Sequence, residues 1–175
     1  TFQVYSNSGT SIYGPFDADS DTDVDANSVD IAAMNSSVLV FAWFDSVGND
    51  VIFQTFTING TPISSVTADA AAGTSRTVGV TEINRTTFIL AWYDQNANDA
   101  TYRVYLANGT SVTSETDVDA DVGTARGVSV SATSQEDFVF SWYDATTDIG
   151  ISTQTFLTNT TQVSSETVVQ SSSQN

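Results

Sequence analysis

Three copies of one apolar, tryptophan-containing stretch limit what this chain can fold into. They occupy residues 38–45, 88–94 and 138–144, and read VLVFAWFD, FILAWYD and FVFSWYD. The three Trp residues of the protein lie in these stretches, 49 and 50 residues apart. Each stretch is too short for a typical globular helix and is rich in aromatic and β-branched residues, which predicts a strand buried on both faces. The fixed period indicates a repeat protein.

Weaker signals recur at matching distances from each Trp. Before each Trp strand lie two β-branched residues that are separated by one other residue. This alternation predicts a strand with one buried face. After the Trp strand come a polar loop, a third strand that ends in an aromatic residue, a turn and a fourth strand. The residues that mark these elements are Val29, Ile31, Asn59 and Ile63 in the first repeat, Val78, Val80, Asn108 and Val112 in the second, and Val128, Val130, Asn159 and Val163 in the third. The Asn-Gly pairs at residues 59–60 and 108–109 predict hairpin turns in which both residues have positive φ.

These units divide the chain into a half repeat, residues 1–24, and the repeats 25–73, 74–123 and 124–175, which we expect to form one array. Four antiparallel strands per repeat are the blade unit of a β-propeller. We therefore predict an all-β fold of tandem four-stranded antiparallel repeats, arranged as propeller-like blades or as stacked sheets. A β-sandwich is the alternative, although its strands would alternate apolar and polar residues, which the Trp strands do not.

The number of repeats is too small for a closed ring, because a propeller has at least four blades. Three explanations remain open at this point. The segment is cut from a longer array, its ends pair with neighbouring subunits, or its sheets stack without closing.

The charge of the chain is strongly negative. It has 21 Asp and Glu residues against 4 Arg, no Lys and no His, for a net charge of −17. Such a surface repels nucleic-acid phosphate and anionic headgroups, so we expect no nucleic-acid partner and no membrane insertion, whereas cations are attracted. Cys is absent, which excludes disulfides and thiol chemistry. No apolar run reaches 18 residues and no export signal is recognisable.

Catalysis has little support in this composition. The chain contains no His, Cys or Lys, so it lacks the commonest general base and common covalent nucleophiles. A two-carboxylate glycosidase stays open as a further class, but nothing pairs two acidic residues specifically. We expect that the protein is not an enzyme.

Three segments follow one another in the third repeat: FVFSWYD at residues 138–144, then ISTQTF at 151–156, then TQVSSE at 161–166. Together they resemble a tandem unit of about 50 residues that occurs in very large secreted surface proteins and adhesins of bacteria and archaea. The family's units read aromatic-Val-Val-x-Trp, then Ile-Tyr-x-Gln-Arg-Phe, then Asp-Gly-x-x-Val. This chain departs from them in having Asn-Gly for Asp-Gly and many Thr residues. The resemblance covers essentially the whole chain and implies a surface-exposed, propeller-like or stacked-sheet module, often near calcium-binding repeats, and no enzyme.

An acidic run at residues 17–25, with a shorter version at 116–121, is the strongest candidate for a metal site. Calcium prefers several carboxylate and carbonyl oxygens, and its ligands would come from Asp17, Asp19, Asp21, Asp23, Asp25, Asp117, Asp119 and Asp121. The EF-hand pattern is incomplete, because its Gly and final Glu are absent. Alternate Asp residues on a straight strand also lie about 7 Å apart. A calcium site and a solvated acidic loop are therefore the two interpretations.

Five Asn-x-Ser/Thr sequons mark candidate glycosylation sites. Three head the turn between the third and fourth strands and two lie in the turn before the Trp strand: Asn59, Asn108 and Asn159, and Asn35 and Asn84. Exposed turns are where a glycan is carried, provided that the protein is exported in an organism that glycosylates. The alternative is that Asn is there only as a turn former.

The repeated Trp and Asp residues have structural interpretations. A sugar-stacking platform is one role for Trp43, Trp92 and Trp142, but equivalent positions inside apolar runs favour core packing. Each Trp strand ends in Asp (Asp45, Asp94, Asp144), which we expect to accept backbone N–H bonds in the next loop, with Arg76 and Arg126 as candidate ion-pair partners.

These expectations lead to one functional hypothesis and one alternative. The hypothesis is an extracellular, non-enzymatic structural protein, a subunit or segment of a cell-surface filament or sheath that self-assembles by β-strand complementation at residues 2–16 and 163–169. The alternative is a carbohydrate- or calcium-binding propeller module of a giant adhesin.

Overall fold

All the strand pairs in the described structure are antiparallel, and turns and loops connect them. The computed structural model describes residues 1–18, 26–70, 73, 77–119, 127–144 and 150–171, and these contain fourteen strands. None of the described residues forms a helix that is long and apolar enough to cross a membrane. The prediction of an all-β fold built from tandem four-stranded antiparallel repeats is confirmed.

The strands form one two-stranded and three four-stranded sheets, each joined in simple up-and-down order. The first sheet pairs β1 (Phe2–Tyr5) with β2 (Ser11–Phe16). The second contains β3 (Ala26–Ala33), β4 (Val38–Asp45), β5 (Asp50–Thr57) and β6 (Pro62–Asp69). The third contains β7 (Val78–Asn84), β8 (Thr87–Asp94), β9 (Asp99–Leu106) and β10 (Thr116–Asp119). The fourth contains β11 (Val128–Ala132), β12 (Asp137–Asp144), β13 (Gly150–Leu157) and β14 (Thr167–Ser171).

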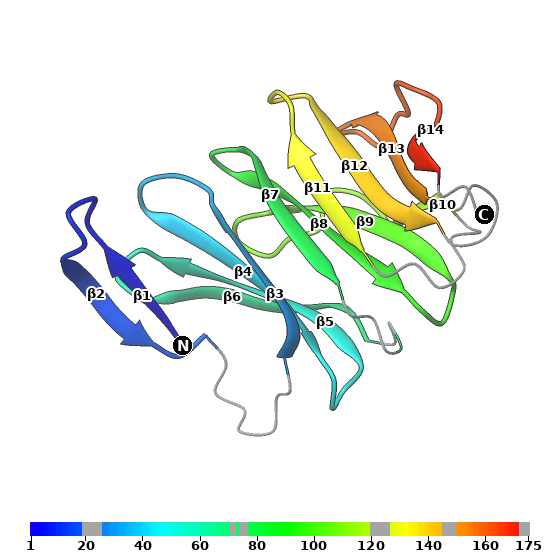
Figure 1. Ribbon diagram of the computed structural model, residues 1–175. Coiled ribbons are helices and arrows are strands. Elements are labelled where there is room, and N and C mark those ends of the chain that lie inside the picture. The colour runs from blue at the N-terminus through cyan, green and yellow to red at the C-terminus, as the bar shows by residue number, and fades with distance from the viewer. Residues whose placement is uncertain (19–25, 71–72, 74–76, 120–126, 145–149, 172–175) are drawn as a thin grey trace.

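The sheets follow one another as an open stack, with β1 and β14 at opposite sides of the molecule (Figure 1). The first strands of the full sheets are neighbours in space, since β7 lies between β3 and β11. This arrangement is that of adjacent propeller blades that do not close into a ring.

The turn between the third and fourth strands differs from the prediction. Gly60 and Gly109 have positive φ, but their Asn neighbours do not. The amide of Gly60 donates to the carbonyl of Thr57, and that of Thr57 to the carbonyl of Thr61, at 2.9 and 2.8 Å. This is the three-residue hairpin loop in which only the last position is left-handed.

The fourth strand also differs in two repeats. Ile63 lies in β6 as predicted, but Val112 and Val163 lie outside β10 and β14. The cause is a side chain that replaces a backbone acceptor: the amide of Val104 donates to Thr113 Oγ1 at 3.1 Å, and that of Thr155 to Ser164 Oγ at 3.0 Å. The regular ladder starts only after these positions.

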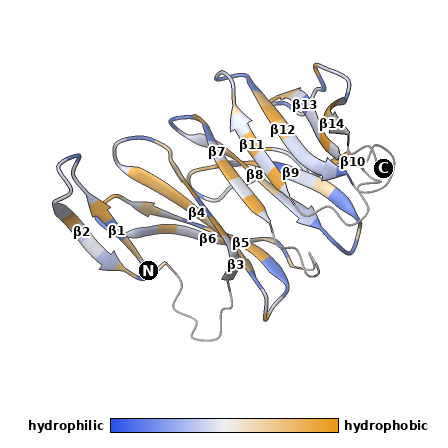
Figure 2. Cartoon of the chain, viewed as in Figure 1, coloured by the Kyte–Doolittle hydropathy of each residue, from blue (hydrophilic) through white to orange (hydrophobic). Residues whose placement is uncertain are grey.

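The hydrophobic core consists of separate layers, each filled from two successive sheets. Between the second and third sheets pack, among others, Phe44, Val51 and Phe53 against Val78, Phe88 and Trp92. Between the third and fourth sheets pack Ile89, Tyr93 and Tyr102 against Val128, Phe138 and Trp142. Strongly hydrophobic residues lie on strands such as β4 and β7, whereas the turns are mainly hydrophilic (Figure 2). A central Trp strand is apolar at every position because each of its faces belongs to a different layer.

Hydrogen bonds between residues about 50 positions apart tie the second sheet to the third. The backbone amides of Val78 and Val80 donate to Ser28 Oγ and Asp30 Oδ2, at 3.0 and 2.8 Å. Thr55 Oγ1 donates to the carbonyl of Ala107 at 2.8 Å. These bonds fix the register of one sheet on the next, which apolar contact alone does not do.

Candidate functional site

The two-stranded sheet at the N-terminus is half of a repeat unit. Val4 and Tyr5 stand before their hairpin turn as Thr55 and Phe56 do in β5, so β1 is equivalent to a third strand. In the full sheets the third strand pairs with a Trp strand on one edge and with a fourth strand on the other. In the part of the chain that the structure describes, β1 pairs with β2 alone. Its other edge is therefore open.

An aromatic side chain from the third strand fixes each sheet to the next one. Phe53 lies between Phe88 and Tyr105 of the following sheet, with ring centroids 5.1 and 4.6 Å away. Phe2 makes a related contact with Phe56, the equivalent of Tyr105, at 5.2 Å, and with Phe41 at 4.5 Å. The half sheet thus packs on the second sheet through the equivalent side chain of its third strand.

Part of the second sheet is uncovered by the described residues. Val78 and Val80 of β7 are 7% and 6% exposed, because the preceding sheet covers them. Their equivalents in β3, Val29 and Ile31, are 68% and 51% exposed. The prediction of one buried face for this two-residue step is therefore wrong for β3, because no preceding first strand lies beside it among the described residues. We call the open edge of β1 and the exposed side chains of Val29 and Ile31 the N-terminal slot.

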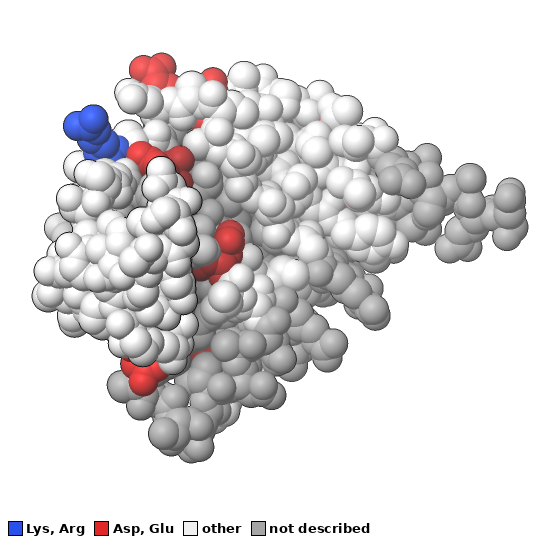
Figure 3. Space-filling view, turned by 60° about the vertical axis from the view of Figure 1, so that its left-hand side comes forward, with Lys and Arg blue, Asp and Glu red and all other residues white. Residues whose placement is uncertain are grey.

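One position of the neighbouring Trp strand, β4, is also less buried than its equivalents. Leu39 is half-buried, whereas its equivalents Phe88 and Phe138 are fully buried. In a view that brings the β1–β2 side of the molecule forward, the described residues are mainly uncharged, with scattered acidic groups and one basic group (Figure 3). The slot is apolar where Val29 and Ile31 lie.

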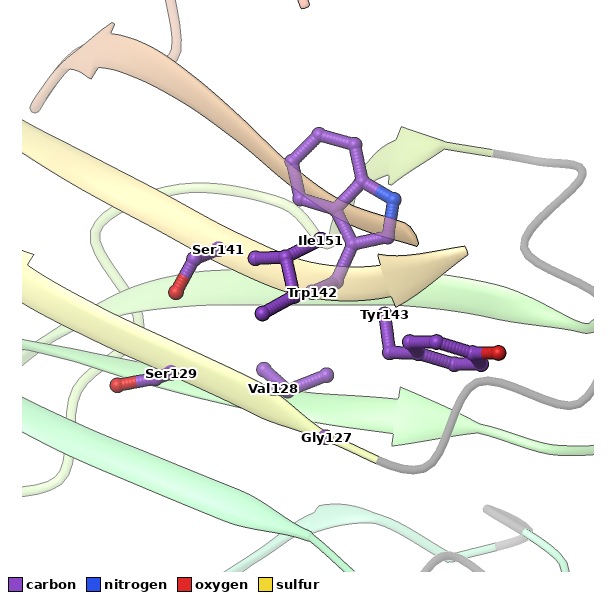
Figure 4. A pocket seen from close by; sticks show the side chains of 7 residues that line it. All are labelled: Gly127, Val128, Ser129, Ser141, Trp142, Tyr143 and Ile151. Carbon is purple, nitrogen blue, oxygen red and sulfur yellow. The ribbon is translucent and has the colours of Figure 1, made fainter. Parts of the chain in front are cut away.

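The outer face of the last sheet is different in chemistry. Thr153 of β13 stands where Phe53 and Tyr102 stand in the preceding third strands, and Ser141 stands where the preceding Trp strands have Ala. A shallow hollow of about 410 Å³ lies on this sheet, between β11, β12 and β13 (Figure 4). Its lining residues are Gly127, Val128, Ser129, Ser141, Trp142, Tyr143 and Ile151. This face lacks the aromatic side chain that joins the other sheets, and it carries more hydroxyl groups.

All three indole rings are buried. Trp43, Trp92 and Trp142 are 5%, 0% and 2% exposed. The indole nitrogen of Trp92 donates to Asp69 of the preceding sheet at 3.2 Å. Rings placed in this way pack between sheets and offer no face on which a sugar could stack.

The acidic residues that we considered as calcium ligands are only partly described. Asp17 accepts a hydrogen bond from Thr1 Oγ1 at 3.0 Å, and Asp117 accepts one from Thr101 Oγ1 at 3.4 Å. Asp119 belongs to β10. The rest of the set, Asp19, Asp21, Asp23, Asp25 and Asp121, lies outside the described residues. Among those that are described, no three His, Cys, Asp or Glu residues form a group that could hold a metal ion.

The Asp residues that end the Trp strands accept loop amides. Asp45 Oδ1 accepts from the amide of Val47 at 2.9 Å, and Asp94 Oδ1 from that of Asn96 at 2.8 Å. Asp144 is buried, while Arg76 and Arg126 lie outside the described residues. At the same end of the second sheet, burial and then the charges of Asp45 and Asp69 raise the pKa of Asp50.

The five sequon Asn residues fall into two environments. Asn59, Asn108 and Asn159 are exposed at hairpin tips, and the last two accept the amide of the residue two positions on, at 3.0 Å. Asn35 and Asn84 are half-buried, and Asn35 Nδ2 donates to the carbonyl of Arg85 on the next sheet at 3.0 Å. The side-chain nitrogen that would carry a glycan is thus engaged between sheets at Asn35.

Two features of the structure escaped the sequence-based predictions. Phe2, Phe53 and Tyr102 each lie three positions before a second aromatic residue (Tyr5, Phe56, Tyr105). This recurrence was visible in the sequence and marks the aromatic side chain that joins the sheets. The ion pair of Arg103 with Glu115, at 2.8 Å, had no repeating signal, because Gln occupies the Arg position in the other repeats. Comparison of the chain with protein-family models and with curated proteins gave no match to either.

Proposed function

We propose that this protein is a non-enzymatic structural module of an extracellular surface assembly, in which molecules join by completing one another's sheets. The observation that carries the proposal is the half sheet β1–β2, whose open edge is one that every full sheet pairs with a Trp strand. Open strand edges are templates for pairing with another chain. A contact of this kind joins unlike surfaces, so it continues into a filament unless rotation closes it.

The burial of the repeated residues supports a structural role over ligand binding. The most distinctive side chains of the repeat, its indoles, lie between sheets. What the molecule offers to its surroundings at the N-terminus is backbone hydrogen-bonding groups and aliphatic side chains. These are the groups used in adding a strand to a sheet.

The placement outside the cell rests on the resemblance to secreted repeat proteins and on the three sequons at exposed hairpin tips. The net charge of −17 supports solubility of a single molecule and opposes close approach of two molecules at low salt. Assembly is therefore expected to strengthen as salt screens this repulsion.

Electron microscopy and analytical ultracentrifugation of the purified protein test the proposal. At about 1 M salt, where the Debye length is about 3 Å, we expect filaments or sedimenting oligomers. Monodisperse single molecules over the whole range of salt and protein concentration would contradict it.

Carbohydrate binding is the second candidate, and one observation favours it. Tyr143 is 37% exposed and lies at one end of the hollow on the last sheet, whose other end carries Ser129 and Ser141 (Figure 4). An exposed aromatic face is suited to stacking against a sugar ring. Titration with oligosaccharides, followed by tyrosine fluorescence and compared with a Tyr143→Ala variant, would separate this candidate from the structural one.

A further inference from the structure

We infer that two hairpin tips of this protein are sites of a spontaneous chemical modification, the conversion of Asn59 and Asn108 to aspartate or isoaspartate. Both Asn residues are exposed, and each is followed by Gly in the turn between the third and fourth strands. The reaction goes beyond the proposed function, because it needs no second molecule. The fold both requires these Gly residues and controls when they react.

The reaction needs only water and the residues of the turn. The backbone nitrogen of Gly109 loses its proton and attacks Cγ of Asn108, the bond from Cγ to Nδ2 breaks, and the nitrogen leaves with a proton as ammonia. Water then opens the resulting succinimide ring at either of its carbonyls and gives aspartate or isoaspartate. Gly favours the ring closure, because it has no Cβ to hinder the attacking nitrogen. The same steps apply to Asn59 and Gly60.

Close packing on the preceding sheet requires Gly at both positions. Gly60 and Gly109 have φ of 86° and 88°, a range that residues with a Cβ rarely adopt. A Cβ on Gly60 would lie 2.5 Å from ring carbons of Phe16 in the half sheet. A Cβ on Gly109 would lie 2.9 Å from Val66 Cγ2 in the second sheet. A larger residue in place of either Gly would therefore disturb the contact between sheets, so the Asn-Gly pairs are built into the stack.

The last sheet contains the same turn without Gly. Thr160 occupies its left-handed position, with φ of 72°. The amides of Gly109 and Thr160 both donate to the carbonyl three residues earlier, at 2.9 Å. Asn108 and Asn159 both accept the amide two residues on, at 3.0 Å. These bonds are the same in the two turns, but the Cβ of Thr160 hinders the ring closure, so Asn159 is expected to stay unconverted.

The folded hairpin slows the reaction at each tip. While the amide of Gly60 donates to the carbonyl of Thr57 at 2.9 Å, its nitrogen keeps its proton and is held in the turn. Ring closure therefore requires a local opening of the hairpin. Because Phe16 packs directly on Gly60, this opening also loosens the contact with the half sheet. In the next hairpin the contact of Gly109 with β6 has the same effect.

The modification changes what the hairpin tips carry. It adds a negative charge at an exposed position and removes Nδ2, the atom to which a glycan would be attached. In the form of isoaspartate it also lengthens the backbone of the turn. Attachment of a glycan to Asn59 or Asn108 and loss of Nδ2 from the same residue therefore exclude each other, whereas Asn159 remains available.

Incubation of the intact chain at mildly alkaline pH, with and without urea, tests the inference. Peptide mapping by mass spectrometry measures conversion at each Asn, and labelling with an isoaspartyl methyltransferase identifies the isomer. We expect conversion of Asn59 and Asn108 in the folded chain, with Asn159 unchanged over the same time. In urea the conversion of Asn59 and Asn108 is expected to be at least about tenfold faster, because the local opening is no longer needed.

A variant of the last turn tests the role of the residue after Asn. Thr160→Gly is expected to make Asn159 convert at a rate similar to that of Asn108. The melting temperature should not fall, because Gly adopts the positive φ of this position without strain.

A variant of the half sheet tests the control by packing. Phe16→Ala is expected to speed both amide exchange at Gly60 and conversion of Asn59 severalfold, and to leave Asn108 unchanged. Tyr13→Ala removes an exposed ring from the same strand and is the matched control, which leaves both rates unchanged.

Four outcomes would overturn the inference: conversion in urea alone, equal conversion of Asn159 in the unmodified chain, an unreactive Asn159 in the Thr160→Gly variant, or an effect of Phe16→Ala that is the same at both tips.

Discussion

The side chain of Asp30 on β3 accepts the backbone amide of Val80 on β7 at 2.8 Å, and so joins the first strands of two successive sheets. The other carboxylate oxygen accepts the amide of Ile31, also at 2.8 Å. One carboxylate therefore bridges two edge strands that share no backbone ladder. The second and third sheets are thus joined by side-chain to backbone bonds as well as by apolar contact.

Replacement of Asp30 is expected to weaken the contact between these two sheets. Asp30→Ala leaves the part-buried Val80 amide without an acceptor, which costs about 1–3 kcal/mol of unfolding free energy. Asp30→Asn keeps one acceptor oxygen and is expected to cost less. Urea unfolding of both variants checks this order, and equal losses for the two would contradict the role of the bond.

The aromatic side chains that join the sheets are expected to contribute differently to the free energy of unfolding. Phe53→Ala removes a fully buried ring and should cost about 3–5 kcal/mol. Phe2→Ala removes a half-buried ring from the half sheet, so the global loss should be smaller. Thermal unfolding measures the first effect.

The second effect is local and needs another measurement. Without the contacts of Phe2 to Phe41 and Phe56, the half sheet is held mainly by its link to β3, so amide exchange in β1 and β2 should accelerate while that in β8 stays slow. Uniform acceleration through the chain would mean that the half sheet is not a separate cooperative unit.

Much of this fold was predictable because most strands of a repeat carry residues that recur at fixed distances from its Trp. The Trp strands give the second strand of each sheet, and the residues at fixed distances from Trp43, Trp92 and Trp142 give the others. Their burial on both faces was also predictable, since no polar residue interrupts the Trp strands of the second and third sheets. The fourth strand was predicted wrongly where a Ser or Thr side chain, as at Thr113 and Ser164, replaces a backbone acceptor.

The open end of the molecule was not predictable from residue type. Val29 and Val78 are the same residue at the same repeat position, yet one is exposed and the other buried. The difference lies in what precedes each strand in space, which the local pattern does not contain. By contrast, the change from Phe53 and Tyr102 to Thr153 was readable and already indicated that the last sheet has a different outer face.

The outer face of the last sheet gives a matched comparison within the chain. Tyr93 and Tyr143 follow the Trp in successive repeats, and are 5% and 37% exposed. Tyr93→Ala is expected to cost about 3–5 kcal/mol and Tyr143→Ala about 1 kcal/mol or less, when both are measured on the monomer. Similar losses at the two positions would mean that something covers the last sheet.

The acidic end of the second sheet is expected to be a source of pH dependence. Burial, then the charges of Asp45 and Asp69, raise the pKa of Asp50 above its usual value of 3.8. The folded protein therefore binds the carboxyl proton of Asp50 more tightly than the unfolded chain does. The contribution of Asp50 to stability is present below the unfolded pKa of 3.8 and is lost as the pH rises through the higher pKa of the folded protein.

Asp50→Asn removes this ionisation. At neutral pH the variant is expected to be more stable by up to about 0.5 kcal/mol, the usual size of a change at a partly exposed position. Well below pH 3.8, where Asp50 is protonated in both states, the two proteins should be equally stable. Melting temperatures from pH 2.5 to 7 measure the difference, and a gain that persists at the lowest pH would have another cause.

The two classes of sequon lead to a prediction about glycan occupancy. In a secreting host that attaches N-linked glycans, we expect Asn59, Asn108 and Asn159 to be occupied more fully than Asn35. The hairpin-tip residues are exposed, whereas Asn35 Nδ2 is bonded to the carbonyl of Arg85 across two sheets. Glycopeptide mass spectrometry of the secreted protein gives the occupancy of each site.

The order of events in the host sharpens this test. Glycans are attached in part before a chain has folded, so early attachment at Asn35 would compete with the contact between the second and third sheets. Asn35→Gln removes the sequon and keeps an amide, and its melting temperature shows what the contact with Arg85 contributes. Full occupancy at Asn35, together with an Asn35→Gln variant as stable as the unmodified chain, would mean that the bond to the Arg85 carbonyl does not prevent glycosylation of Asn35. Low occupancy there with high occupancy at the hairpin tips would show that the stacked sheets, and not the sequon alone, decide where glycans are carried.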